Sequence, residues 1–338
     1  MKIETVKKLA LGLVAALALL LVVAVIVRIA MPQGTPDTGA TRPAMTQPET
    51  TLPATTGDTA PAPEAVEITW KTFPENRRLK AKQAFVYDCR NQSITVVSGS
   101  ENDRVYPASV TKLFTAHVAL QYLKPEQIVT ATDALELVGP GSSIARIEKG
   151  DTLTVAQLVE AMLLPSGNDA AYLLAVEVGR IIKNDNGLSA AQAKAVFVEQ
   201  MNREAAVQGM TGTRFENPDG YHQEGHYTTF ADLVTIGNLS LQNETLMKYA
   251  GVSSDRVTLA SGEKQWKNTN ALVDPMSEYY CPYTVGLKTG QTPSAGSCLL
   301  SAFDVAGVQY IIGVFGCPEE EDRFDDTLQL LNEILGKG

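Results

Sequence analysis

The stretch Tyr106-Pro107-Ala108-Ser109-Val110-Thr111-Lys112-Leu113-Phe114-Thr115 places a serine hydroxyl and a lysine amine three residues apart. At this spacing on a helix, both side chains project from one face. A lysine kept neutral by desolvation can take the serine proton and turn the hydroxyl into a nucleophile. The free backbone N–H groups of the first turn can receive a developing oxyanion. The stretch therefore predicts a nucleophile, Ser109, and its base, Lys112, at the exposed tip of an apolar, buried helix.

The Ser-x-x-Lys pattern alone is weak evidence, because the chain contains a second match, Ser261-Gly262-Glu263-Lys264. This second match lies in a polar, glycine-containing stretch without an apolar helix behind it. We interpret it as a solvated turn, and it serves as the control for the first.

Length and composition allow one large globular domain or two modest ones, and they argue against a fibrous, wholly disordered or nucleic-acid-binding protein. The chain has 338 residues, of which 44% are hydrophobic, so it can bury a sizeable core. Its net charge of -10 argues against nucleic acid as a partner, since phosphate binding requires clustered Lys and Arg. Four cysteines lack metal-type spacing. Three disulfide connectivities are open to them, but we expect them to be free or structurally inert.

The N-terminal region carries an export signal followed by a spacer. Residues 9–27 are continuously apolar, with three lysines before them and only Arg28 directly after, which places the N-terminus in the cytoplasm. We predict that residues 1–31 form an uncleaved transmembrane signal anchor, with a cleaved signal peptide as the alternative. Residues 32–66 are rich in Pro and Thr and predict a disordered linker. Residues 67–338 would form an extracytoplasmic catalytic domain at the cell membrane.

Within that domain, strand patterns lie at both ends and helix patterns in the middle. This arrangement predicts an α/β (α+β) fold in which an antiparallel sheet is built from both chain ends, flanked by helices and joined to a mostly helical lobe. The expected strands are 83–89, 93–97, 283–288, 298–303 and 308–315, and the expected helices are 154–164, 169–178, 189–208, 229–241 and 324–335.

Two further polar clusters follow Ser109 along the chain. Ser166-Gly167-Asn168 supplies a hydroxyl and an amide on a turn between helices, although helix capping would explain it equally well. Lys288-Thr289-Gly290 is expected at the end of a strand, where it opens a loop. There it offers a cation for a carboxylate, a hydroxyl beside it, and room for a backbone to approach.

The order Ser-x-x-Lys, Ser-x-Asn, Lys-Thr-Gly is the signature set of penicillin-binding proteins and serine β-lactamases. The runs 107–112, 164–171, 201–205, 215–220 and 286–292 closely resemble those of the D-alanyl-D-alanine carboxypeptidases, the low-molecular-mass penicillin-binding proteins. The resemblance covers about residues 79–320. It implies the serine β-lactamase/DD-peptidase-like fold and a substrate that is a peptidoglycan stem peptide ending in D-Ala-D-Ala.

The resemblance also implies a role for each matching residue. Ser109 would attack the penultimate D-alanine carbonyl with Lys112 as base, and Ser166 would relay protons or help to deliver water. Asn168 would position Lys112 and the substrate amide. The terminal carboxylate would bind to Lys288 and Thr289, next to Gly290, and the oxyanion would be held by the backbone N–H groups of Ser109 and Gln291. Neither a metal nor a diffusible cofactor is implied.

Two other functions remain open at this point. A β-lactamase of class A should carry a Glu-x-x-Leu-Asn loop that activates water, and none is present, so penicillin and other β-lactam antibiotics should acylate the chain and remain bound. Alternatively, the chain could be a penicillin receptor or wall-binding protein without useful turnover. His222 and His226 have a spacing that could suggest a metal site, but Pro218, Gly220 and Gly225 make a helix there improbable and no third ligand is evident.

Overall fold

The computed structural model describes residues 78–100 and 102–337. The predicted membrane anchor and linker lie outside these residues. In the part of the chain that is described, no helix combines the length and the apolar character that crossing a bilayer requires.

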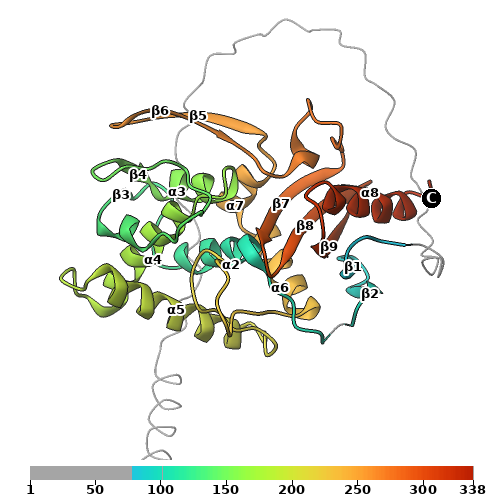
Figure 1. Ribbon diagram of the computed structural model, residues 1–338, viewed down its shortest axis with the longest axis horizontal. Coiled ribbons are helices and arrows are strands. Elements are labelled where there is room, and N and C mark those ends of the chain that lie inside the picture. The colour runs from blue at the N-terminus through green and yellow to red at the C-terminus, as the bar shows by residue number, and fades with distance from the viewer. Residues whose placement is uncertain (1–77, 101, 338) are drawn as a thin grey trace, which may run out of the picture. The chain divides into compact units, whose positions relative to one another are not determined.

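A five-stranded sheet forms the centre of the fold (Figure 1). Its order is β2-β1-β9-β8-β7, and every neighbouring pair is antiparallel. The first two strands come from the start of the domain and the other three from its end, so the expected sheet from both chain ends is confirmed. The strands are β1 (Gln83–Asp88), β2 (Ser93–Ser98), β7 (Thr284–Thr292), β8 (Gly296–Val305) and β9 (Val308–Cys317).

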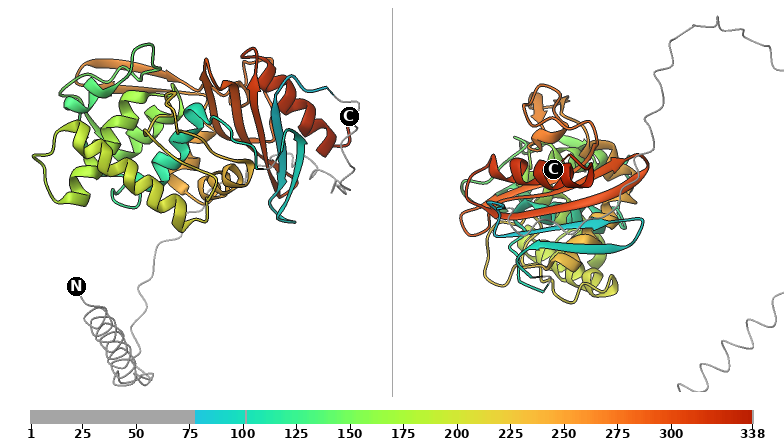
Figure 2. Two further views of the ribbon diagram at one scale, coloured as in Figure 1. Left: turned by 60° about the horizontal axis from the view of Figure 1, so that its bottom comes forward. Right: turned by 90° about the vertical axis from the view of Figure 1, so that its right-hand side faces the viewer.

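Helices cover both faces of the sheet and build a lobe beside it (Figures 1 and 2). Helix α8 packs on β8 and β9 from one side, whereas α6 packs on the same strands from the other. Helix α2 lies between the sheet and the helical lobe, where it contacts α3, α4, α5 and α7. The helices are α2 (Thr111–Ala119), α3 (Val155–Leu163), α4 (Asn168–Lys183), α5 (Ala190–Val207), α6 (Phe230–Leu241), α7 (Glu244–Ala250) and α8 (Asp322–Ile334).

Side-chain caps fix where several of these helices begin. Ser189 and Gln192 form a reciprocal capping box at the start of α5, as their spacing predicts. Thr154 and Gln157 form the same motif ahead of α3. Thr229 accepts a hydrogen bond from the backbone N–H of Asp232 at the start of α6.

The sheet separates two hydrophobic clusters. The larger one joins the inner face of the sheet to the helical lobe, and the smaller one lies under α8. Phe85 of β1 packs against Phe230 of α6 with tilted rings whose centroids lie 5.0 Å apart. Gly313 of β9 makes room for this ring, since a Cβ atom there would lie 2.2 Å from Phe85. The helical lobe is thereby held against the sheet.

Four features differ from the sequence-based expectations. Helix α7 (Glu244–Ala250) was not expected. The hairpin of β5 (Ser254–Leu259) and β6 (Gly262–Lys267) and the short pair β3 (Ile128–Thr130) and β4 (Thr152–Thr154) were not expected. Lys288-Thr289-Gly290 does not open a loop, because β7 continues to Thr292. The strand continues because these residues pair with β8 as far as Gly296.

Strand β7 is the last strand of the sheet, and no described strand pairs with its outer edge. The four cysteines, all in the described residues, carry free thiols.

Candidate active site

Ser109 lies on a short 3-10 turn, η1 (Ala108–Val110), that leads directly into α2. Its neighbour Ala108 has a φ of +46°, a value that residues with a Cβ atom rarely adopt. The turn contacts β7 and β8, so it is held between the sheet and the helical lobe. The serine is half-buried, whereas the helix behind it is almost completely buried, as expected.

Lys112 points back along α2 to the serine. Its Nζ donates hydrogen bonds to Ser109 Oγ at 2.7 Å and to the backbone oxygen of Asp219 at 2.9 Å. The side chain is completely buried. Burial lowers the pKa of Lys112 to about 8, although the charges of Asp219 and Asp169 oppose this shift. An amine with this pKa is partly neutral near pH 7, and it lies within proton-transfer distance of the serine.

Two glycines allow the backbone to close around Ser109. Gly220 has a φ of +80°, and a Cβ atom there would lie 1.8 Å from the carbonyl oxygen of Ala108. A Cβ atom on Gly290 would lie 3.0 Å from the backbone nitrogen of Ser109. Any side chain at either position would therefore displace the turn that carries Ser109.

Ser166-Gly167-Asn168 forms the connection between α3 and α4, and both polar side chains are buried. Ser166 has a φ of +61°, and Asn168 is the first residue of α4. Asn168 lines the same pocket as Ser109. Asn168 is expected to position Lys112, but among the described residues the hydrogen bonds of Lys112 Nζ go to Ser109 Oγ and to the backbone oxygen of Asp219.

Asp169 fixes the loop that faces this connection. Its carboxylate accepts hydrogen bonds from the backbone N–H groups of Ala145 at 2.9 Å and Ile147 at 3.1 Å. Asn168 N also donates to Ser143 O at 2.9 Å. The loop with Ser142 and Ser143 is therefore attached to the start of α4.

Lys288 and Thr289 lie in β7 on the other side of the site, and both are buried. Thr269 bridges them, because its hydroxyl lies 2.6 Å from Thr289 Oγ1 and accepts from Lys288 Nζ at 3.3 Å. Burial and the charges of Lys112 and Arg323 hold the pKa of Lys288 well below its usual value. Among the described residues no carboxylate pairs with Lys288, so this part of the site is suited to an incoming anion.

Sequence reasoning missed Arg323 and Thr269. Arg323 lies on α8 with 5% of its surface exposed, and its guanidinium donates to the backbone oxygen of Gly290 at 3.5 Å. It adds a buried positive charge near Lys288. No local pattern marks either residue, because only the packing of α8 and of the segment after β6 brings them to β7.

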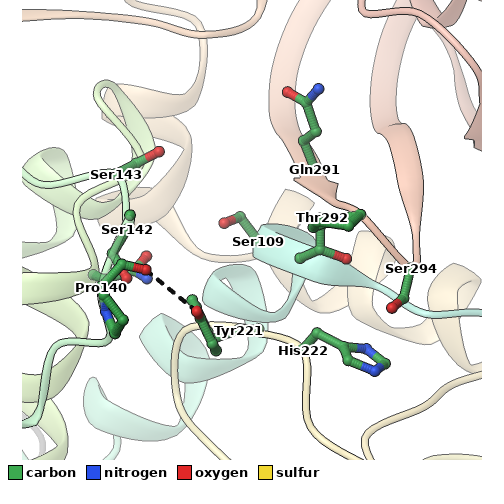
Figure 3. Close-up of a pocket in the computed structure, with 13 residues that line it drawn as sticks. Ser109, Pro140, Ser142, Ser143, Tyr221, His222, Gln291, Thr292 and Ser294 are labelled. Atoms are coloured by element: carbon green, nitrogen blue, oxygen red, sulfur yellow. Dashed lines mark hydrogen bonds between the residues drawn. The ribbon is translucent and has the colours of Figure 1, made fainter.

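A pocket of about 470 Å³ opens over Ser109 (Figure 3). Figure 3 shows Ser109 between the loop with Ser142 and Ser143 and the end of β7 with Gln291 and Thr292. Tyr221 and His222 close a further side, and Tyr221 Oη donates to Pro140 O at 3.2 Å. The pocket lining contains no Asp, Glu, Lys or Arg. Its walls therefore offer hydroxyl, amide and backbone groups to a peptide.

His226 supports the site from behind. Its Nδ1 accepts from the backbone N–H of Glu216 at 3.2 Å, so Nε2 carries the proton and donates to Thr111 Oγ1 at 2.9 Å. Burial lowers the pKa of His226 to about 4, so the ring is neutral. His117 instead contacts Glu204 and Gln121, away from the serine.

The second Ser-x-x-Lys match is structural, as expected. Ser261 lies in the turn between β5 and β6, and its hydroxyl donates to the carboxylate of Asp151 at 2.7 Å. Lys264 pairs with Glu148 at 3.1 Å. These contacts fix the hairpin and leave no lysine beside the serine.

A family model described as D-alanyl-D-alanine carboxypeptidase matches residues 70–319. The D-alanyl-D-alanine carboxypeptidase of Streptomyces sp. (strain K15) is 31% identical over 248 residues, which are 70% of this chain and 81% of the relative. D-alanyl-D-alanine carboxypeptidase DacF of Bacillus subtilis (strain 168) is 27% identical over 260 residues, which cover 75% of this chain. Those residues span 61% of the Bacillus relative, less than two thirds of its length.

Solved structures agree with these matches. The crystal structure of the Streptomyces K15 DD-transpeptidase has a TM-score of 0.69 and 27% identity, and covers 77% of this chain and 98% of its own. Penicillin-binding protein D2 from Listeria monocytogenes in its cefotaxime-bound form has a TM-score of 0.63 and 26% identity, and covers 78% of this chain and 100% of its own. The expected fold is thus confirmed, and the chain belongs to the D-alanyl-D-alanine carboxypeptidase family.

Proposed function

We propose that this chain is a serine-type D-Ala-D-Ala carboxypeptidase that removes the terminal D-alanine from peptidoglycan stem peptides. The observation that carries the proposal is the 2.7 Å hydrogen bond between Lys112 Nζ and Ser109 Oγ inside a buried site. This geometry places a desolvated amine where it can take the serine proton at the moment of attack. Membership of the carboxypeptidase family supports the same reaction.

The substrate would lie along the outer edge of β7. Its terminal carboxylate would bind to Lys288 and Thr289, with Arg323 adding positive charge nearby. Because Gln291 and Thr292 follow them in the strand and line the pocket, the rest of the stem peptide would extend into the pocket. An extended peptide can pair with the free main-chain groups of an edge strand.

The reaction would begin when Ser109 Oγ attacks the penultimate D-alanine carbonyl carbon and its proton moves to Lys112 Nζ. The backbone N–H groups of Ser109 and Gln291 would hold the oxyanion. When the C–N bond breaks, the D-alanine amine takes a proton, with Ser166 as the relay, and an ester on Ser109 remains. Water would then cleave the ester and regenerate the serine.

β-Lactam antibiotics would acylate the same serine, because their strained amide presents a carbonyl and a nearby carboxylate in the same arrangement. Labelled penicillin should therefore form a covalent adduct with the parent protein. Ser109→Ala should abolish the label, and Ser261→Ala, the matched control on the hairpin, should label normally. Labelling of the Ser109 variant would show that another residue is the nucleophile.

A second assay separates the alternatives. Diacetyl-Lys-D-Ala-D-Ala should release D-alanine with turnover, and the penicilloyl adduct should persist for much longer than seconds. No D-alanine at high protein concentration would favour a penicillin receptor, whereas loss of the adduct within seconds would favour a β-lactamase.

We further infer that residues 1–31 anchor the chain in the cell membrane, with the catalytic domain outside the cytoplasm. The apolar run 9–27 and the charge difference across it support this inference. A carbonate wash should leave the full-length chain with the membranes, and N-terminal sequencing of that fraction should begin near Met1. A mature chain that begins after residue 30 would instead indicate a cleaved signal peptide.

A further inference from the structure

Asp219 has a buried carboxyl group whose hydrogen-bonding capacity is largely unused. Only 1% of the residue is exposed, and its Oδ2 has no hydrogen-bond partner among the described residues. Oδ1 accepts a single long hydrogen bond from the backbone N–H of Tyr221 at 3.3 Å. Asp169, also buried, differs because its carboxylate accepts from three backbone N–H groups. A buried carboxyl left in this state calls for a physical explanation.

The residue that carries this carboxyl contacts the proposed base through its backbone. The backbone oxygen of the same residue accepts the hydrogen bond from Lys112 Nζ at 2.9 Å. Burial raises the pKa of Asp219 and lowers that of Lys112, and the charge of each residue opposes the shift of the other. Ionisation of either group therefore favours the charged form of the other.

The loop that carries Asp219 is held rigidly in place. Asn217 Oδ1 accepts from the backbone N–H of Gly220 at 2.8 Å, and its Nδ2 donates to Tyr221 O at 2.8 Å. Gly220 is packed against the carbonyl of Ala108, one residue before the nucleophile. The distance between the carboxyl and the amine is thus set by the fold.

Few other charges act on the pair. Lys112 is acted on by Asp169 of α4 and Lys288 of β7. Asp219 is acted on by Tyr172 of α4 and Lys194 of α5.

We propose that Asp219 is a positioning residue of the proposed acyl transfer, whose carboxylate controls the pH at which Lys112 becomes the free base. The inference rests on the proposed function, since it concerns the same serine and lysine. While Asp219 is ionised, Lys112 holds its proton more tightly. When the carboxylate is neutralised or removed, Lys112 releases its proton at lower pH.

The test is the pH dependence of acylation by labelled penicillin, measured from pH 5 to pH 10 on the full-length chain. In Asp219→Asn, which removes the charge and keeps the shape, the acidic limb should move down by about one pH unit. At pH 6 the variant should then reach a roughly tenfold larger fraction of its own plateau rate than the parent protein does.

Glu160→Gln is the matched control. Glu160 is a second buried carboxyl with an unpartnered oxygen, but it faces Asp255 and Lys248 rather than Lys112. Its variant should leave the acidic limb in place. If Asp219→Asn does not fold, Asp219→Ser removes the same charge and should move the limb in the same direction.

The outcomes separate the inference from the function on which it rests. A folded Asp219 variant that is slower at every pH, with its limb unmoved, would overturn the inference, and so would one that labels at no pH. An equal shift in Glu160→Gln would overturn it as well. Failure of the parent protein to label at Ser109 would instead remove the proposed function.

Discussion

Replacing the buried lysine should make the protein more stable and less active, by an amount that depends on pH. In Lys112→Met, a side chain of similar length without charge occupies the same cavity. The pKa of Lys112 falls from its usual 10.5 to about 8 in the folded chain, and each tenfold loss of proton affinity corresponds to about 1.4 kcal/mol. Burying the charged amine therefore costs the parent protein about 3 kcal/mol at pH 7.

The sign of the pH dependence follows from this shift. Between pH 8 and 10.5 the unfolded chain binds more protons at Lys112 than the folded chain does, so the parent protein gains stability as the pH rises. The variant has no such gain. Its stability advantage over the parent should shrink by about 2 kcal/mol between pH 7 and pH 9.5. Asp219 loses its neighbouring cation in the variant. This loss also makes the stability advantage of the variant smaller as the pH rises.

Urea unfolding of both full-length proteins in detergent at the two pH values measures this difference. Lys149→Met is the control, because an exposed amine stays hydrated in both states, and its difference from the parent should not depend on pH. An advantage of Lys112→Met that is equal at pH 7 and pH 9.5 would show that Lys112 is not desolvated. Its role as a base at neutral pH would then lose its physical support.

Three other changes have defined outcomes. Gly220→Ala should slow acylation by labelled penicillin about 100-fold, because its Cβ atom would push against Ala108 O; an unchanged rate would show that the loop can yield. Asp169→Asn should lower the free energy of unfolding by about 1–3 kcal/mol in urea titrations, since an amide cannot accept from every N–H group that the carboxylate binds; an unchanged midpoint would contradict this. Thr269→Val should raise KM for diacetyl-Lys-D-Ala-D-Ala about tenfold with a smaller effect on kcat, whereas a change in kcat alone would argue against a role in carboxylate binding.

The sequence predicted the elements whose signal is local. The expected strand at residues 83–89, the capping box at Ser189 and the apolar helix behind Ser109 each depend on neighbours within a few residues, and the structure contains all three. Strand β1 ends at Asp88, however, and its burial does not alternate, because residues 84–86 are all buried. The resemblance carried by the order of the motifs placed Lys288 in the same site as Ser109, and Lys288 lies in β7, the strand that the turn with Ser109 contacts.

Residues that depend on long-range packing could not be predicted. Thr269 and Arg323 join the site only because the segment after β6 and helix α8 pack near β7. No local sequence pattern marks Asp219. Its proposed role depends on its burial near Lys112, which only the fold brings about. The hairpin of β5 and β6 could not be predicted, because its strands are mostly polar. The hairpin contacts the helical lobe through a few side chains such as Trp266.

Under the binding mode proposed above, the outer edge of β7 has a consequence for resistance to β-lactam antibiotics. Hydrogen bonds from the main chain of an edge strand do not depend on which side chains the strand carries, so point mutations cannot delete them. Variants selected under β-lactams should therefore accumulate at side chains around the pocket, such as Ser142, Ser143 and Ser294. Changes at Gly220 and Gly290 should be rare among survivors, because they would disable the natural reaction together with the drug target.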